Sequence, residues 1–290
     1  MPSSLPRSLA ELPVRRLTPS DLVACADLCE DRGWPRDEQR WGLLLTAGTG
    51  YGMDDPGGKG LMASCVVTSY GPDLAAVGML LVAERYARQG IARHLMERVL
   101  EEHGSTPLSL YATAAGQPLY DRLGFTVVGR TQRVTGHYRP GDEKPRGVAT
   151  IHPATAEDLR AIIRLDTGAF GTDRTHVLAR LPAFADHIRV ARAQDEIVGY
   201  AALWPSDRTH VVGPLIAPDT DTAEALVAAL SAATDLPLRA DIDARHTDLL
   251  DRLEQRGLLP SSATTVMTLG ASDLPGDWRR RYAPLTVATG

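Results

Sequence analysis

Apolar runs in this chain alternate with glycine-bearing turns and amphipathic helical patterns. The stretch from Val77 to Ala92 predicts an apolar strand and then a basic turn, and residues 93–104 predict a helix. A second strand and a short helix that carries Tyr120 are predicted between Leu110 and Phe125. Where a turn opens a helix, consecutive backbone N–H groups point outward and can hold a pyrophosphate. We therefore expect a binding turn for a phosphorylated cofactor close to Tyr120.

The chain contains this order of elements twice. Near Val14 and again near Ile151, a short strand leads to a threonine and then, three residues later, to an aspartate. Such a pair satisfies the free N–H groups of a helix N-terminus. Four further pairs of segments match in the same order: 61–71 with 197–207, 75–83 with 210–218, 108–113 with 236–241, and the Asp-Arg-Leu segments at 121–123 and 251–253. Matches in one order along both halves indicate a duplicated fold.

Two short turns bear on how the strands pair. Residues 70–72 and 194–196 have the composition of hairpin turns, which favour antiparallel neighbours. We therefore predict a mixed α/β fold in which two tandem domains each have a largely antiparallel central sheet flanked by helices. The first domain is expected at 1–140 and the second at 148–290, joined by a linker at 141–147 rich in Pro, Gly and charge. The C-terminal tail either closes onto the body as a final strand or is only partly ordered.

The two copies differ at the turn that follows their central strand. The first copy has arginines and Gly90 there, whereas the second has carboxylates between residues 219 and 224 and no glycine. Carboxylates repel a pyrophosphate, and without glycine the backbone cannot approach one as closely. Leu250 stands in the second copy where the first has Tyr120. We therefore expect one site, in the first copy, with a degenerate second copy that supports or shapes it.

Composition narrows the class of protein. The chain has 290 residues, of which 43% are hydrophobic and 23% charged, as in typical globular proteins. Its net charge of −5 argues against a nucleic-acid partner, because such partners usually require a basic surplus. No membrane-length apolar run and no secretory h-region is present, so a cytoplasmic protein without a membrane partner is expected. Cys25, Cys29 and Cys65 form no zinc pattern, and no metal is expected.

Two motifs give the first copy a specific resemblance. Residues 87–92 read Ala-Arg-Gln-Gly-Ile-Ala, and residues 119–125 read Leu-Tyr-Asp-Arg-Leu-Gly-Phe. Over residues 13–140 the chain resembles the GCN5-related N-acetyltransferase (GNAT) superfamily, which carries Gln/Arg-x-x-Gly-x-Gly/Ala and Leu-Tyr-x-x-x-Gly-Phe at these places. Ala87 replaces the leading Gln or Arg, whose contact the neighbouring Arg88 can supply. The second copy resembles the degenerate GNAT-like domain of a tandem subfamily.

The resemblance implies an acetyl-CoA-dependent N-acetyltransferase. A neutral amine would attack the thioester directly, without a covalent acyl-enzyme, and acetyl-CoA would lie where two central strands splay apart. Tyr120 is then the candidate general acid for the CoA thiolate, and the alternative is an aromatic residue that anchors its helix. Arg93 and His94 are alternatives for the nucleotide 3′-phosphate. The residues expected to bind the cofactor are Leu80, Leu81, Val82, Arg88, Gln89, Gly90, Ile91, Ala92, Arg93 and Thr113, the last in the position of the family's Asn.

The sequence does not identify the general base or the acceptor amine. The strand before the turn has no carboxylate, so the proton leaves through water to Glu84, Asp241 or Asp243, or the amine arrives neutral. Trp34, Trp41 and Asp241 are candidate acceptor-site residues, and the tryptophans are equally explained as core residues. A second domain over the site favours a small primary amine. The alternatives are a CoA-binding sensor or scaffold without turnover, and an enzyme acting on a protein amine; the oligomeric state is left open.

Overall fold

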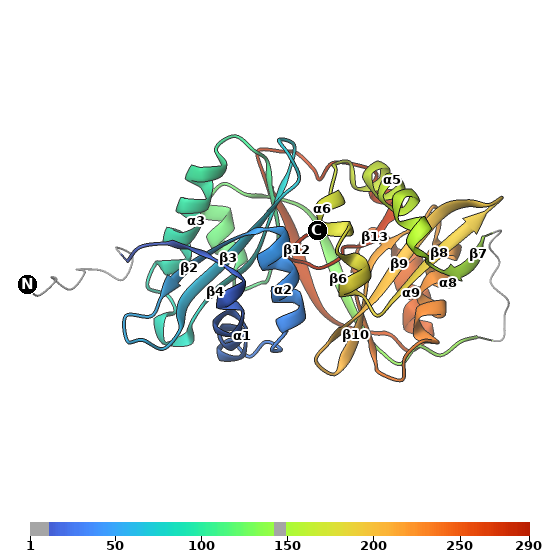
Figure 1. Cartoon of the computed structure of the whole chain (residues 1–290), viewed down its shortest axis with the longest axis horizontal. Coiled ribbons are helices and arrows are strands. Elements are labelled where there is room, and N and C mark those ends of the chain that lie inside the picture. Colours follow the sequence, from blue (N-terminus) through green and yellow to red (C-terminus); the bar gives the residue numbers. More distant parts are fainter. Residues whose placement is uncertain (1–11, 142–148) are drawn as a thin grey trace, which may run out of the picture.

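The computed structural model describes residues 12–141 and 149–290, and the two sequence copies form two α/β halves side by side (Figure 1). The predicted linker at 141–147 lies outside the described residues apart from Gly141. The first half contains β1 (Arg15–Leu17), α1 (Leu22–Asp31), α2 (Glu38–Ala47), β2 (Thr49–Asp54), β3 (Leu61–Ser69), β4 (Ala75–Val82), α3 (Ile91–His103), β5 (Leu108–Ala112), α4 (Gln117–Arg122) and β6 (Thr126–Gly136). The second half contains β7 (Thr150–Pro153), α5 (Leu159–Phe170), α6 (Thr175–Leu178), α7 (Leu181–Phe184), β8 (His187–Ala193), β9 (Glu196–Ser206), β10 (Thr209–Ile216), α8 (Thr220–Ser231), β11 (Leu238–Asp243), α9 (Thr247–Gln255), β12 (Leu259–Leu269) and β13 (Arg281–Ala283).

One continuous sheet runs through both halves. Its strand order is β1-β2-β3-β4-β5-β12-β6-β11-β10-β9-β8-β7, and β13 pairs with β10 off this path. Among the described strands, only β4 with β5 and β10 with β11 pair in parallel. The largely antiparallel arrangement predicted from the hairpin turns is thereby confirmed.

The corresponding strands β6 and β12 each lie in the part of the sheet that belongs to the other half. β12 is inserted between β5 and β6, so that Met267 lies opposite Leu110 on one side and Val127 on the other. β6 in turn pairs with β11, where Val134 lies opposite Ala240. Each half therefore completes the sheet of the other, and the hydrogen-bonded ladder crosses the boundary predicted between the copies.

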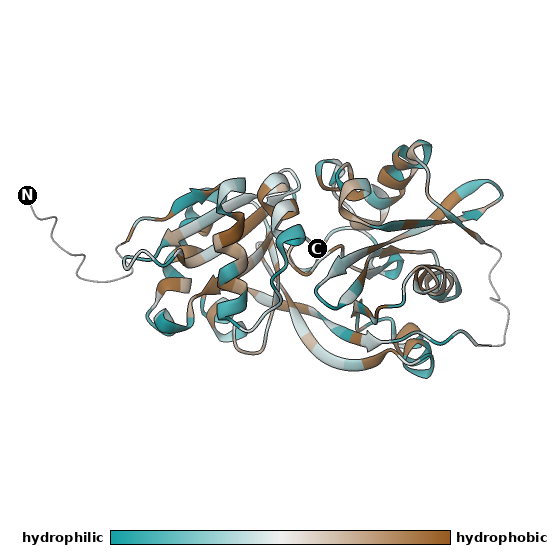
Figure 2. Cartoon of the chain, turned by 60° about the horizontal axis from the view of Figure 1, so that its bottom comes forward, coloured by the Kyte–Doolittle hydropathy of each residue, from teal (hydrophilic) through white to brown (hydrophobic). Residues whose placement is uncertain are grey.

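Helices cover both faces of the sheet in each half. α3 buries Leu95, Met96 and Val99 against Leu110 of β5, because these positions recur at helical spacing. On the opposite face α1 and α2 pack around Trp41. The second half repeats this arrangement, with α8 and α9 on one face and α5, α6 and α7 on the other. Figure 2 shows hydrophobic residues gathered where helices meet the sheet. None of the helices in the described residues is both long enough and apolar enough to cross a membrane.

The C-terminal residues return through the centre of the molecule (Figure 1). β13 pairs antiparallel with β10, so the tail closes onto the body as a final strand, which was one of its two expected outcomes. Beyond β13, the tail reaches the first half, where Tyr70 donates a hydrogen bond to the carbonyl of Thr289. A Cβ at Gly78 would lie 2.5 Å from the Cβ of Ala288, so a larger residue at Gly78 would displace the tail. The tail thus packs on both halves.

Candidate active site

The strands β4 and β5 pair only at their start. Residues 75–77 pair with 108–110, and the ladder stops there. Met79 has a φ of 52° and lies within a register shift between β4 and β3, so β4 turns away from β5 at this point. A cavity of about 860 Å³ opens along the diverging strands. Its volume lies in the usual range for cofactor and small-molecule sites.

This cavity collects most of the residues that the sequence proposed for cofactor binding. Those that line it are Leu80, Leu81, Val82, Arg88, Gly90, Ile91, Ala92, Arg93 and Thr113. Gln89 is not among the lining residues, since its side chain turns back to the carbonyl of Arg85 at 3.4 Å. Arg85 itself is bound to Asp55 and also lies off the cavity. The Thr113 hydroxyl accepts a hydrogen bond from the Gly116 N–H at 3.2 Å, which fixes the approach to α4.

The turn before α3 presents backbone N–H groups to the cavity. Arg88 and Gly90 have positive φ angles of 62° and 82°. The first helical hydrogen bond runs from the N–H of His94 to the carbonyl of Gly90 at 3.0 Å, so the N–H groups of residues 91–93 have no helical acceptor. A Cβ at Gly90 would meet no atom within 4 Å and would project into open space. Free N–H groups at a helix N-terminus form a ready site for phosphate.

Among the described residues, the charged side chains that line the cavity are all arginines. The lining arginines are Arg32, Arg40, Arg88, Arg93 and Arg122, and no aspartate or glutamate lines the cavity there. Arg40 has an exposed side-chain fraction of 9%, and its Nε lies 3.6 Å from Asp37. Arg93 donates to Glu97 at 2.7 Å, whereas Arg88 forms no ion pair with a described residue. In a chain with a net charge of −5, this site concentrates positive potential and suits an anionic ligand.

Tyr120 faces this cavity from α4. Its ring packs edge-on against Phe125, with ring centroids 5.8 Å apart, and the N–H of Phe125 returns to the carbonyl of Tyr120. The residue is 9% exposed, and its hydroxyl forms no hydrogen bond with the described residues. Burial raises the pKa of Tyr120 above that of a free phenol. The hydroxyl therefore holds its proton at neutral pH and is able to donate it.

The two candidate tryptophans take different positions. Trp34 is 38% exposed and lines the large cavity. Trp41 is fully buried, and its indole N–H donates to the Sγ of Cys29 at 3.1 Å. Trp41 is therefore a core residue between α1 and α2 and does not line the large cavity.

The candidate bases are each bound to an arginine. Asp241 is held by Arg133 through two hydrogen bonds of 2.8 and 3.1 Å, which join β11 to β6. Asp243 accepts from Arg245 at 2.6 Å, and the exposed Glu84 is paired with Arg32, a lining residue of the large cavity. None of these acids lines the large cavity. The structure therefore places Asp241 in a link between strands and not among the lining residues.

The corresponding cleft of the second half is filled by the protein itself. β10 and β11 pair from His210 to Val212, and beyond that point β13 pairs with β10. A Cβ at Gly213 would lie 2.3 Å from the carbonyl oxygen of Pro284. The N-terminus of α8 is capped by Asp219, whose carboxylate accepts from the Thr222 N–H at 2.7 Å. β13 and Asp219 thus occupy the places that correspond to the strand cleft and the phosphate turn of the first half.

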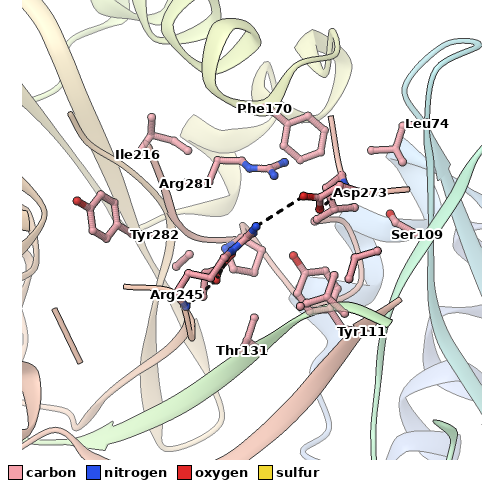
Figure 3. A pocket seen from close by; sticks show the side chains of 18 of the residues that line it. Leu74, Ser109, Tyr111, Thr131, Phe170, Ile216, Arg245, Asp273, Arg281 and Tyr282 are labelled. Carbon is pink, nitrogen blue, oxygen red and sulfur yellow. Dashed lines mark hydrogen bonds and ion pairs between the residues drawn. The ribbon is translucent and has the colours of Figure 1, made fainter. Parts of the chain in front are cut away.

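A smaller cavity of about 30 Å³ lies between the two halves (Figure 3). Its lining includes Ser109 and Tyr111 of β5 and, from the second half, Phe170, Arg245 and Arg281. Tyr111 lines both cavities, so the two adjoin at this residue.

The sequence reasoning missed Tyr111, Arg40 and the tail residues Val287 and Ala288, all of which line the large cavity. A signal for Tyr111 exists in the strand pattern, because Ser109 and Tyr111 alternate with buried apolar residues of β5 and must face the other side. The tail residues carry no such local signal, since their place depends on a partner in the first half.

Comparisons with known proteins agree with this geometry. A family model described as an acetyltransferase (GNAT) domain matches residues 66–138, and a second model with the same description matches residues 162–283. The uncharacterised N-acetyltransferase YitH of Bacillus subtilis strain 168 is 30% identical over 234 residues, which cover 79% of this chain and 82% of that relative.

Solved structures share the fold over nearly the whole chain. A Pyrococcus horikoshii protein provisionally described as an acetyltransferase has a TM-score of 0.79 at 18% identity, over 100% of this chain and 99% of its own. A tandem GNAT protein from the clavulanic acid biosynthesis pathway has a TM-score of 0.63 at 13% identity, over 91% of this chain and 100% of its own. The chain therefore belongs to the GCN5-related N-acetyltransferase (GNAT) superfamily, as a tandem acyltransferase with two GNAT domains.

Proposed function

We propose that this enzyme transfers the acetyl group of acetyl-CoA to a primary amine of a small molecule, by direct attack of the amine on the thioester. Enzymes of the family generally use acetyl-CoA. The observation that carries the proposal is the large cavity, which joins the turn around Gly90 to Tyr120 along the splayed strand β4. Bound acetyl-CoA would supply an activated thioester, and positioning and proton transfer fall to residues of this chain.

The cofactor would be held by backbone and arginine together. The free N–H groups of residues 91–93 suit the pyrophosphate, and Arg88 suits the contact that Ala87 cannot make. Residues 80–82 lie beyond the last pairing with β5, so their free backbone groups suit the pantetheine amides. Arg93 lines the cavity and His94 does not, which favours Arg93 for the nucleotide 3′-phosphate.

Tyr120 would give its proton to the departing thiolate. As the bond between the amine nitrogen and the acetyl carbon forms, the bond from that carbon to sulfur breaks, and the phenol proton moves to sulfur. The attacking nitrogen loses a proton in the same reaction. Because no carboxylate of the described residues lines the cavity, we propose that the amine enters neutral and that its proton leaves through water and restores Tyr120.

We assign catalysis to the domain at 1–140 and a supporting role to the domain at 148–290. The filled cleft beside β13 and the capped N-terminus of α8 support a single cofactor site per chain. The second half also walls the acceptor side through the smaller cavity, and an enclosed acceptor side favours a small molecule over a protein amine.

Calorimetric titration with acetyl-CoA, followed by a thiol-release screen against amino acids, polyamines and aminoglycosides, tests this function. We expect one site per chain and thiol release that depends on the amine. Two sites would contradict the single-site assignment, and absence of binding would contradict the cofactor site. Binding with turnover only on peptide amines would point to a protein acceptor, and binding without any turnover would point to a CoA sensor.

A further inference from the structure

We propose that the smaller cavity binds the carboxylate of the acceptor, with Arg281 as its counter-ion, so that the acceptor is an amine of the amino-acid class. The inference rests on the proposed function, because it names the acceptor for the same site.

Three guanidinium groups line the cavity, and they differ in their partners. Arg174 donates two hydrogen bonds of 2.7 Å to Asp166 and a third of 2.8 Å to the carbonyl oxygen of Gly290. Arg245 is engaged by Asp243 at 2.6 and 3.0 Å. These two arginines are therefore neutralised within the protein.

Arg281 has no such partner. Its side chain forms no hydrogen bond and no ion pair with the described residues, and its Cζ lies 5.7 Å from the centroid of the Phe170 ring. The remaining acid at the cavity, Asp273, is half exposed and lies 3.8 Å from Arg245. Arg281 is partly buried, and a partly desolvated guanidinium without a counter-ion is stabilised by a bound anion.

The surroundings of Arg281 also favour the binding of an anion. Burial lowers the pKa of Arg281 from the ordinary arginine value; Tyr111 and Asp243 oppose this effect, and the charges of Arg174 and Arg245 add to it. β13 holds the backbone of Arg281 opposite Ile216 of β10, so the side chain starts from a fixed position. Figure 3 shows the guanidinium of Arg281 pointing toward the ring of Phe170, with the carboxylate of Asp273 and the hydroxyl of Tyr111 at the same space. A preorganised cation beside a hydroxyl is suited to an anion.

The size of the cavity selects the anion. Its volume of about 30 Å³ corresponds to roughly two or three water-sized positions, which matches the three heavy atoms of a carboxylate group. The rest of the molecule must then leave the cavity. The adjoining large cavity offers the space, because Tyr111 lines both and directly follows the last residue of β5 that pairs with β4. A carboxylate at Arg281 therefore directs the amine past Tyr111 toward the thioester end of the large cavity.

Paired acceptors test the assignment. Each proteinogenic amino acid is compared with its carboxamide in thiol-release kinetics, using wild type, Arg281→Gln and the control Arg279→Gln. Arg279 is exposed, lies outside the cavity and stands two positions away, so its removal changes net charge equally. We expect wild type to prefer the acid over the amide in kcat/KM by at least roughly tenfold, as sites that pair with a polar group reject analogues lacking it. Arg281→Gln should bring this ratio close to one by raising KM for the acid, with KM for acetyl-CoA unchanged.

A second measurement separates this inference from the proposed function. Thermal stabilisation by propionate, propionamide and inorganic phosphate is recorded in the presence of CoA, and it requires no turnover. Stabilisation of wild type and Arg279→Gln by propionate, and its loss in Arg281→Gln, would support the carboxylate site even if no amine reacted. Equal effects on both variants, no effect of propionate on wild type, or stronger stabilisation by phosphate would overturn it. Turnover of amines with equal use of acid and amide would leave the acetyltransferase function standing and refute the carboxylate site.

Discussion

The environment of Tyr120 suits a proton donor better than a proton acceptor. The phenol is almost fully buried and has no hydrogen-bond partner among the described residues, and burial raises its pKa. A higher pKa keeps the hydroxyl protonated but weakens it as an acid. The CoA thiolate needs little help from an acid to depart, because it is a good leaving group near neutral pH. In the proposed mechanism the same hydroxyl would contribute to the chemical step and little to binding of the cofactor.

Tyr120→Phe should lower kcat by roughly 10²-fold, at the lower end of the range for general acid catalysis. The affinity for acetyl-CoA should stay within about twofold, because the ring still packs on Phe125 and only an unbonded hydroxyl is lost. Steady-state kinetics and calorimetry measure the two quantities. Tyr138→Phe, in which the lost hydroxyl contacts Glu224 at 3.4 Å away from the cavity, is the control. An unchanged kcat would assign Tyr120 to anchoring its helix.

Gly90→Glu should abolish detectable binding of acetyl-CoA. The glutamate would place a side chain and a negative charge where the free N–H groups of α3 point, and Gly90 has no neighbour within 4 Å to hold that side chain back. Its φ of 82° adds a backbone strain of about 1–2 kcal/mol. Gly104→Glu at the other end of α3 places the same charge in open space away from the cavity, at φ 56° and ψ −117°, a backbone conformation more strained than that of Gly90. Calorimetry should show binding lost in the first variant and kept in the second; retention in both would exclude the turn as the phosphate site.

How far single residues can be predicted from the sequence depends on where their partners come from. Gly90 and Tyr120 lie in motifs that fix their own local backbone, so their places on the N-terminus of α3 and on α4 follow from neighbouring residues. Trp41 and Asp241 depend on Cys29 and Arg133, which belong to other elements. Arg281 lies in a basic run whose members cannot be told apart until β13 is placed beside β10.

At the scale of elements, β13 accounts for the main difference between the clefts of the two halves. It takes the position beside β10 that the first half leaves open beside β4. His246, just before α9, fastens it: Nε2 lies 3.1 Å from the carbonyl of Trp278 and 2.9 Å from that of Arg281. The imidazole also stacks on Tyr282, with ring centroids 3.8 Å apart. A single buried imidazole thus holds the strand that carries the proposed carboxylate ligand.

This contact predicts a pH dependence of stability. Burial lowers the pKa of His246, with smaller opposing effects from the carbonyls it contacts and from Asp243. The unfolded chain binds a proton near pH 6.5 while the folded state does so only at lower pH. The contribution is therefore complete above about pH 6.5 and is lost as the pH falls, with a slope of at most ~1.4 kcal/mol per pH unit.

Urea unfolding at about pH 7.5 and about pH 5.5 checks this sign. Wild type should lose more free energy of unfolding on acidification than His246→Gln, which has no imidazole to protonate. His152→Gln, at an exposed position of β7, should behave as wild type. The assignment fails if all three proteins lose the same amount.

At the scale of the whole molecule, the exchange of β6 and β12 makes each half depend on the other. β5 borders the large cavity, and its second neighbour in the sheet is β12 from the far half. The duplication and the antiparallel sheets could be predicted because each copy carries its own local pattern. The exchange of β6 and β12 could not be predicted, because these two strands correspond to each other in the two copies. The alternation of residues within such a strand does not say whether it will pair with β5 or with the corresponding strand β11.

The exchange predicts that residues 1–141 alone do not form an acetyl-CoA site. Without β12 and β11, one edge of β5 and both edges of β6 lose their partners, and Thr265, Val266 and Met267 no longer cover the residues opposite them. Co-expression of 1–141 with 149–290 should restore binding at one site per complex, because β12 and β6 can pair in trans. Calorimetric titration of the fragment, the co-expressed pair and the intact chain gives the comparison, and the intact chain should unfold in a single calorimetric transition. Binding by the fragment alone with the affinity of the intact chain would mean that the first half is independent, and that the shared sheet joins two domains without completing either.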